Sequence, residues 1–298
     1  MKNKNFLFLS VVLILAWTSH PVHAENISFR ICYSTNTIQK GDLFSWIDSF
    51  NTLWQDWQSS RGGTLDGQFK AAQYGFSYDV EMRIPIVSGL AFNIGGSQLK
   101  SRTEGTVNLD QAGRDQSETH SISNKITAVP LKIGLSYSFR LPFFSHLSVC
   151  VGGGRLIVLG KYETSERYDL ILQQQSSEYD YWYERSNTFK SDALGFYANV
   201  ALEYELAKFV AVVVEAEQKW AKLSGFKGPY TYEDFEGNQE SGKASLYFYE
   251  SNQWGLGKYY SVLYGHRKRP DDAEIRNTRQ GELNFGGYSL KVGIRILF

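Results

Sequence analysis

The sequence has 298 residues, and its 31 basic and 31 acidic side chains balance to a formal net charge of zero. Nucleic-acid binding usually needs a basic excess, so the charge balance gives no support for that class of partner, and none is expected. The length allows one or two ordinary domains. Aromatic residues make up 15% of the chain, and glycine occurs 27 times.

The first 24 residues are predicted to be an export signal. Lys2 and Lys4 precede a short apolar stretch, and Val22-His23-Ala24 has the small residues of a cleavage site. We place the cut after Ala24, so that residues 25–298 form the exported protein. Beyond that point no 18 consecutive residues are apolar, which excludes later membrane-spanning helices.

Apolar and polar residues alternate over much of the exported chain. From Tyr74 to Ile84 the even positions are apolar, whereas the odd positions include Asp79, Glu81 and Arg83. Successive side chains of a strand point to opposite faces, so these two faces meet different solvents. The pattern recurs at 125–140, 191–206, 209–220 and 288–298, and more weakly at 27–34, 89–101 and 146–161.

These eight segments predict an all-β fold, an up-and-down antiparallel transmembrane β-barrel. The connections between them alternate between tight turns and long extracellular loops, as in outer-membrane barrels. The long loops are expected at residues 35–67, 102–124, 162–190 and 225–283.

Three details of this barrel prediction depend on short segments. Residues 245–250 and 258–264 are strand-like, which makes ten strands possible, but each is shorter than the roughly 9–11 residues needed to span a membrane. We therefore expect a hairpin above the membrane there. Residues 166–172 and 179–183 are expected to extend two strands beyond the membrane. Pro130 falls inside a predicted strand, and we expect it near the outer rim, where a bulge is tolerated.

The last strand resembles the C-terminal assembly signal of outer-membrane proteins, an alternating strand that ends in an aromatic residue. Its alternating residues are Tyr288, Leu290, Val292, Ile294, Ile296 and Phe298. The whole exported chain resembles the small eight-stranded barrels of the OmpA/OmpX type. This resemblance implies a location in the bacterial outer membrane, contact with its lipid and lipopolysaccharide, and recognition of the last strand by the barrel-assembly machinery. It implies no single activity, because the family includes anchors, adhesins, small-solute channels and lipid-modifying enzymes.

The polar strand faces are expected to fill the barrel, because an eight-stranded barrel is just wide enough for side chains. Seven basic and six acidic candidates point inward, which predicts a plug of ion pairs and no continuous pore. Nine of them form the predicted lumen network: Arg30, Asp79, Glu81, Lys132, Glu203, Glu215, Glu217, Lys291 and Arg295. The other four are Arg83, Arg140, Glu205 and Lys219.

The first long loop contains apolar residues at helical spacing, within residues 42–58. They include Trp46, Ile47, Phe50, Trp54 and Trp57. This amphipathic helix is either a lid on the barrel mouth or a helix in the outer-leaflet interface, where tryptophan is favoured.

Other candidate sites are weaker. His120 with Ser121 or Ser123 could serve a lipid-acting hydrolase, although no acidic partner is placed by the sequence. The basic segment at residues 266–269 could bind lipopolysaccharide phosphates, but acidic residues follow it at once. Cys32 and Cys150 are expected to be free buried thiols, and no metal site or cofactor is expected.

We therefore expect a non-enzymatic outer-membrane barrel whose surface loops act in envelope integrity or binding. Tyrosines in the loops suit recognition, since each offers contact area and a polar group; they are Tyr179, Tyr181, Tyr183, Tyr230, Tyr232, Tyr247 and Tyr249. A narrow channel or carrier for small or hydrophobic solutes and a lipid-acting hydrolase are the alternatives. The surface ligand is left unassigned.

Overall fold

The computed structural model describes residues 27–37, 41–70, 74–111, 116–174 and 177–298, so the predicted export signal lies outside the described residues. Eight antiparallel strands form a closed ring, because β1 pairs with both β3 and β15, and β8 pairs with both β15 and β7. The predicted eight-stranded up-and-down barrel is confirmed. Its strands are β1 (Ser28–Thr37), β3 (Tyr74–Val87), β4 (Leu90–Gln111), β5 (Gln116–Leu141), β6 (Phe144–Gln174), β7 (Ser177–Ala207), β8 (Val210–Trp220) and β15 (Gly287–Leu297).

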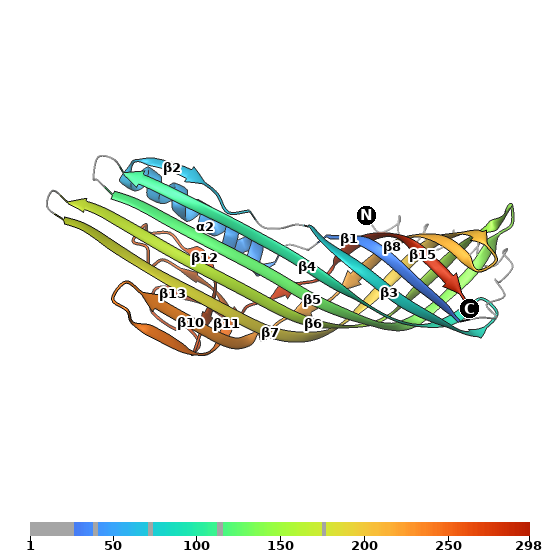
Figure 1. Cartoon of the computed structure of the whole chain (residues 1–298). Coiled ribbons are helices and arrows are strands. Elements are labelled where there is room, and N and C mark those ends of the chain that lie inside the picture. The colour runs from blue at the N-terminus through green and yellow to red at the C-terminus, as the bar shows by residue number, and fades with distance from the viewer. Residues whose placement is uncertain (1–26, 38–40, 71–73, 112–115, 175–176) are drawn as a thin grey trace.

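The wall of the barrel is much taller on one side than on the other. Strands β4 to β7 have 22 to 31 residues, whereas β1, β8 and β15 have 10 or 11, and Figure 1 shows the four long ribbons running far past the short ones. Most of residues 102–124 and 162–190, expected as loops, is strand instead: β4 pairs with β5 as far as Gln111 and Gln116, and β6 pairs with β7 as far as Gln174 and Ser177. These long connections stay on the side of the barrel opposite the tight turns. The expected strand extensions at 166–172 and 179–183 are confirmed.

The remaining elements all belong to the part above the barrel. Strand β10 pairs with β7, β11 with β10, and β12 with β11, so the sheet continues outside the ring. The strand-like segments 245–250 and 258–264 thus form a hairpin above the membrane, as expected. The elements are α2 (Asp42–Arg61), β2 (Thr64–Gly67), β9 (Lys222–Leu223), β10 (Lys227–Asp234), β11 (Gln239–Ser251), β12 (Tyr260–His266), β13 (Ile275–Gln280) and β14 (Leu283–Asn284). Among the described residues, no helix is long and apolar enough to cross a membrane.

The outward face of the barrel is apolar and exposed, while its interior is polar. Tyr78, Leu202 and Val292 are exposed, whereas Asp79, Glu203 and Lys291 beside them in sequence are buried. This distribution is the reverse of a water-soluble protein and is the one that a transmembrane β-barrel requires. The barrel therefore has the surface of a membrane-spanning protein.

The six alternating residues of the last strand lie on this apolar face. Tyr288, Leu290, Val292 and Ile294 are exposed, and Ile296 is half-buried. Phe298 packs edge-on against Phe29 of β1, with ring centroids 5.6 Å apart. Recognition of this strand by the assembly machinery stays a prediction.

Pro130 is accommodated without the expected bulge. The β4–β5 pairing passes from Gly96 opposite Leu131 directly to Leu99 opposite Ala128, and the register is the same on both sides. Proline cannot donate to the ladder, so the pairing with β4 is interrupted here and resumes in the same register.

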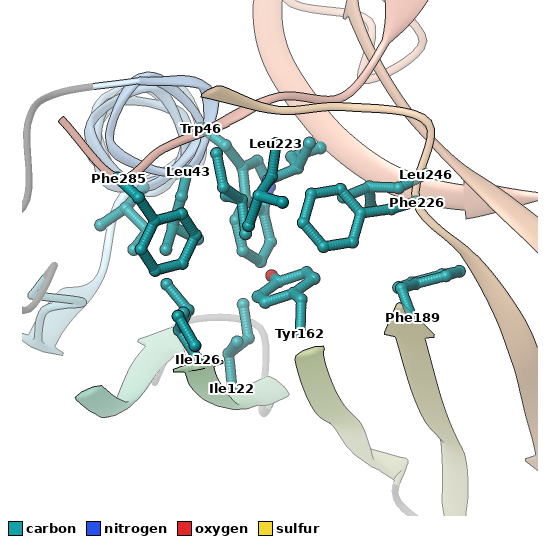
Figure 2. Packing of buried hydrophobic residues seen from close by; sticks show 14 of the residues in the cluster. Leu43, Trp46, Ile122, Ile126, Tyr162, Phe189, Leu223, Phe226, Leu246 and Phe285 are labelled. Carbon is teal, nitrogen blue, oxygen red and sulfur yellow. The ribbon is translucent and has the colours of Figure 1, made fainter. Parts of the chain in front are cut away.

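Above the barrel, apolar side chains form a separate core. Figure 2 shows Ile122, Ile126, Tyr162 and Phe189 projecting from the long strands toward Trp46, Leu223, Phe226 and Phe285. Tyr162, Phe189, Leu223 and Phe226 are fully buried. This core fixes α2 and the later segments against the inner face of the tall wall.

Candidate ligand-binding site

The structure places the predicted lumen residues in the interior of the barrel. Lys291 Nζ lies 3.1 Å from Asp79, 2.9 Å from Glu215 and 2.8 Å from Glu217. Lys132 Nζ lies 2.9 Å from Asp79 and 2.7 Å from Glu217. Two lysines and three carboxylates from four strands therefore form one cluster.

A second cluster lies nearer the tight turns. Arg30 contacts Glu81 at 2.9 Å and also pairs with Glu215, which links the two clusters. Arg83 contacts Glu81 at 3.2 Å and Glu203 at 2.6 Å. Arg295 reaches Glu203 at 3.2 Å.

Three further inward candidates have different places. Lys219 lies in the interior, 3.5 Å from Glu217, with its ammonium donating to Asn36 at 2.6 Å. Arg140 and Glu205 instead pair with each other at the tight-turn rim, where both are reached by solvent. Arg140 is therefore no part of the filling, because the rim of the barrel is open to water.

Both cysteines are free and buried, as expected from their strands. Cys32 lies on β1 and Cys150 on β6, each facing the barrel interior.

Helix α2 lies against the inner face of the sheet above the barrel mouth, which is the place of a lid. Trp54 is fully buried, and Trp46 and Ile47 are nearly so, so these side chains are withheld from lipid. The helix start is held by Asp42, which pairs with Arg279 at 2.7 Å. Toward its end, Asp56 accepts from Lys258 at 2.8 Å.

A pocket of about 360 Å³ opens between α2 and the tall wall. Aromatic side chains from five separate parts of the chain line most of its surface. The lining residues are Trp46, Phe50 and Trp57 of α2, His120 of β5, Glu166 and Tyr168 of β6, Tyr181 and Tyr183 of β7, and Tyr249, Trp254, Val262 and Tyr264 from β11, β12 and the loop between them.

Polar groups meet at one side of this aromatic pocket. His120 Nε2 lies 2.8 Å from Glu166 Oε1, and the Tyr183 hydroxyl donates to the same oxygen at 3.1 Å. Burial would raise the pKa of Glu166, but hydrogen bonding and charge from His120, with the charge of Arg185, lower it below its ordinary value. Glu166 therefore stays ionised at neutral pH.

The ring of His120 is itself enclosed by aromatic rings. Phe50 lies edge-on at a centroid distance of 5.0 Å, and Tyr168 at 5.6 Å. The Tyr168 hydroxyl donates to Glu118 at 3.0 Å, and Glu118 pairs with Arg61 of α2 at 2.9 Å. These contacts connect the polar side of the pocket to the end of the helix.

On the far side, the guanidinium of Arg185 lies over the ring of Tyr264, 4.1 Å from its centroid. The Tyr249 hydroxyl and His266 Nε2 are 3.0 Å apart. Burial and the nearby Arg185 charge lower the pKa of His266 to about 4. His266 is therefore uncharged at neutral pH.

The serines suggested for a hydrolase do not face His120. Neighbouring residues of a strand point to opposite faces, and Ser121 Oγ lies 3.0 Å from Thr106 Oγ1, while Ser123 donates to Glu104 at 3.3 Å. The predicted His–Ser constellation is therefore wrong. The acidic partner of the histidine, Glu166, lies 46 residues away, and nothing in the sequence joined the two.

The basic segment at 266–269 is also engaged within the protein. Arg267 pairs with Glu240 at 2.6 Å, and Arg269 donates to the carbonyl of Thr278 at 2.8 Å.

Of the pocket residues, Trp46, Phe50 and Trp57 came from the helix prediction and Tyr181, Tyr183 and Tyr249 from the loop tyrosines. Glu166, Tyr168, Trp254 and Tyr264 were missed, because no local motif marks them.

Comparison with known proteins gave structural neighbours only. No protein-family model and no curated protein sequence matches this chain. Among solved structures, the chain is similar to the outer membrane protein OprG from Pseudomonas aeruginosa (TM-score 0.39, 9% identity, covering 94% of this chain and 98% of that one). It is also similar to a major outer membrane protein from Thermus thermophilus (0.36, 15%, 93% and 100%) and to the outer membrane protease OmpT from Escherichia coli (0.30, 9%, 94% and 99%).

Proposed function

We propose that the protein is a non-enzymatic binding protein of the outer membrane, in which the barrel is a closed anchor and the extracellular pocket holds a sugar ring of a surface glycan. The observation that supports this proposal is the pocket itself. Its aromatic walls converge from separate segments on a few polar groups, the usual composition of a small-molecule site.

The aromatic walls suit a flat ring. Trp57, Tyr168 and Tyr264 offer wide, rigid faces that can cover the C–H face of a sugar. The hydroxyls of Tyr183 and Tyr249 and the Glu166 carboxylate can exchange hydrogen bonds with its hydroxyl groups.

Two other ligand classes fit the same pocket less well. A wholly apolar molecule would bury Glu166 and His120 without replacing their water, which is costly. An organic cation would gain little from Glu166, because His120 and Arg185 already lie close to that carboxylate. A neutral ring with hydroxyl groups can form hydrogen bonds with Glu166 and His120, and its binding does not depend on a charge attraction to Glu166.

The ion-paired interior supports an anchor rather than a channel. Purified protein in planar bilayers is therefore expected to show no steady conductance, and porin-sized current steps would contradict the closed barrel.

Binding can be tested with the purified full-length barrel in detergent on an array of bacterial and host glycans, followed by tryptophan fluorescence with the sugars that bind. Trp57→Ala is expected to weaken binding about tenfold, or ~1.4 kcal/mol, because a ring face is lost. Glu166→Gln should weaken it as well.

Trp182→Ala is the matched control, since Trp182 lies on the other face of β7 beneath Arg167 and does not line the pocket. If Trp182→Ala weakens glycan binding as much as Trp57→Ala does, or if no glycan binds at all, the proposal is wrong.

A further inference from the structure

A row of lysines crosses the outward face of the tall wall. Lys161 of β6 lies directly opposite Lys190 of β7, and Lys190 lies directly opposite Lys227 of β10. In the other direction the row passes through Thr127 of β5 to Lys100 of β4. Three neighbouring strands therefore present the same charge at the same level of the ladder.

This arrangement is unfavourable for the protein alone, because like charges directly opposite each other destabilise a sheet. The charge of Lys161 is compensated by Glu163, 2.7 Å away. Among the described residues, no carboxylate forms an ion pair with Lys190 or Lys227, both of which are exposed. Asp192 faces the same side two residues along β7 and pairs with neither.

The row lies immediately beyond the apolar surface of the barrel. Leu159, two residues before Lys161, is 48% exposed, and Leu194, four residues from Lys190, is 75% exposed. The outward face thus changes from aliphatic to cationic within a few residues. In a membrane, that boundary is the level at which lipid phosphates lie.

We propose that the Lys161–Lys190–Lys227 row is a binding site for the phosphate groups of lipopolysaccharide in the outer leaflet. Ammonium groups bind phosphate as point charges through charge-assisted hydrogen bonds, and a phosphate between two of these lysines removes their repulsion. The site is independent of the aromatic pocket, which opens on the inner face of the same wall.

The proposal can be tested by measuring binding of the detergent-purified barrel to three probes. These are phosphorylated lipid A, lipid A from which both phosphates have been removed, and phosphatidylglycerol. Lys190→Gln/Lys227→Gln is expected to weaken binding of phosphorylated lipid A about fivefold per lysine, or about 25-fold in all. The dephosphorylated lipid should bind the native protein and the variant equally weakly.

Lys208→Gln/Lys268→Gln is the matched control, because it removes the same charge from two exposed lysines at the tight-turn rim and in the 266–269 segment. An equal loss in this control would overturn the site. Phosphatidylglycerol binding as tightly as lipid A would also overturn it, since the row would then be a general anionic-lipid surface.

Thermal unfolding gives a second readout that a merely structural role would not produce. In detergent alone the Lys190→Gln/Lys227→Gln variant is expected to be at least as stable as the native protein, because repulsion is removed. Phosphorylated lipid A should raise the Tm of the native protein more than that of the variant. A variant that is destabilised without lipid and equally stabilised by it would contradict the proposal.

Discussion

The barrel and the part above it use the same strands with opposite polarity. On β5, Ile133 and Leu135 face outward and are exposed in the barrel wall, while Lys132 faces inward. Beyond Pro130 the pattern reverses, since Ile122 and Ile126 are buried on the inner face, and Ser121 and Ser123 lie on the outer one. Side chains still alternate between the two faces along the whole strand. Above Pro130, however, the inner face is apolar and the outer face is polar.

The two interiors are consequently stabilised in different ways. Below the reversal, the interior is held by compensated charges, each of which depends on its partners. Above it, the interior is held by the burial of aromatic and aliphatic side chains. Substitutions in the two regions should therefore destabilise the protein for different reasons, and this difference can be tested.

The largest effect is expected from removing a central cation of the barrel. Lys291→Met leaves Asp79, Glu215 and Glu217 with one fewer counter-charge, and breaking a buried pair costs about 3–5 kcal/mol. Urea unfolding of the barrel in lipid vesicles measures the loss. Lys208→Met, at the exposed rim, should change stability little, and a similar cost for both variants would contradict the charge-held interior.

A smaller effect tests the reversal on β5 directly. Ile133→Lys puts a charge on the lipid-facing side and is expected to cost about 2–4 kcal/mol near the midplane. Ser121→Lys points the same way on the same strand but lies above the reversal, so its cost should stay within about 0.5 kcal/mol. Equal costs in the same vesicle assay would place the membrane boundary elsewhere.

The smallest effect concerns pH and only the upper region. His266 has a folded pKa of about 4 against an ordinary value of 6.5, so between these values the unfolded chain takes up a proton that the folded one refuses. Stability of the upper region therefore falls as pH drops from 6.5 toward 4. His266→Gln should flatten this dependence in limited proteolysis of the β11–β12 segment, and an unchanged profile would show that another group is responsible.

The barrel could be predicted from the sequence because alternation is a local property of each strand. The polarity of residues such as Tyr78 and Asp79 indicates which face of the strand each one occupies, and no knowledge of the rest of the chain is needed. Strand count, tight turns and the inward charges followed from that property alone.

The upper region could not be predicted in the same way. On the extended hairpin of β6 and β7, polar and aromatic residues occupy both faces, so residues 162–190 gave the composition of a loop. The contact of His120 with Glu166 and the alignment of Lys161 with Lys190 depend on register between strands. Register is set when the strands pair in the folded sheet, so it cannot be inferred from the sequence of any single segment.

The pairing of Asp42 with Arg279 joins the first and last extracellular segments across 237 residues. Leu43, next to Asp42, and Phe285, six residues after Arg279, belong to the same core. Strand β15 begins two residues after Phe285. The segment that leads into the last barrel strand therefore also holds α2, one wall of the pocket, in place above the barrel mouth.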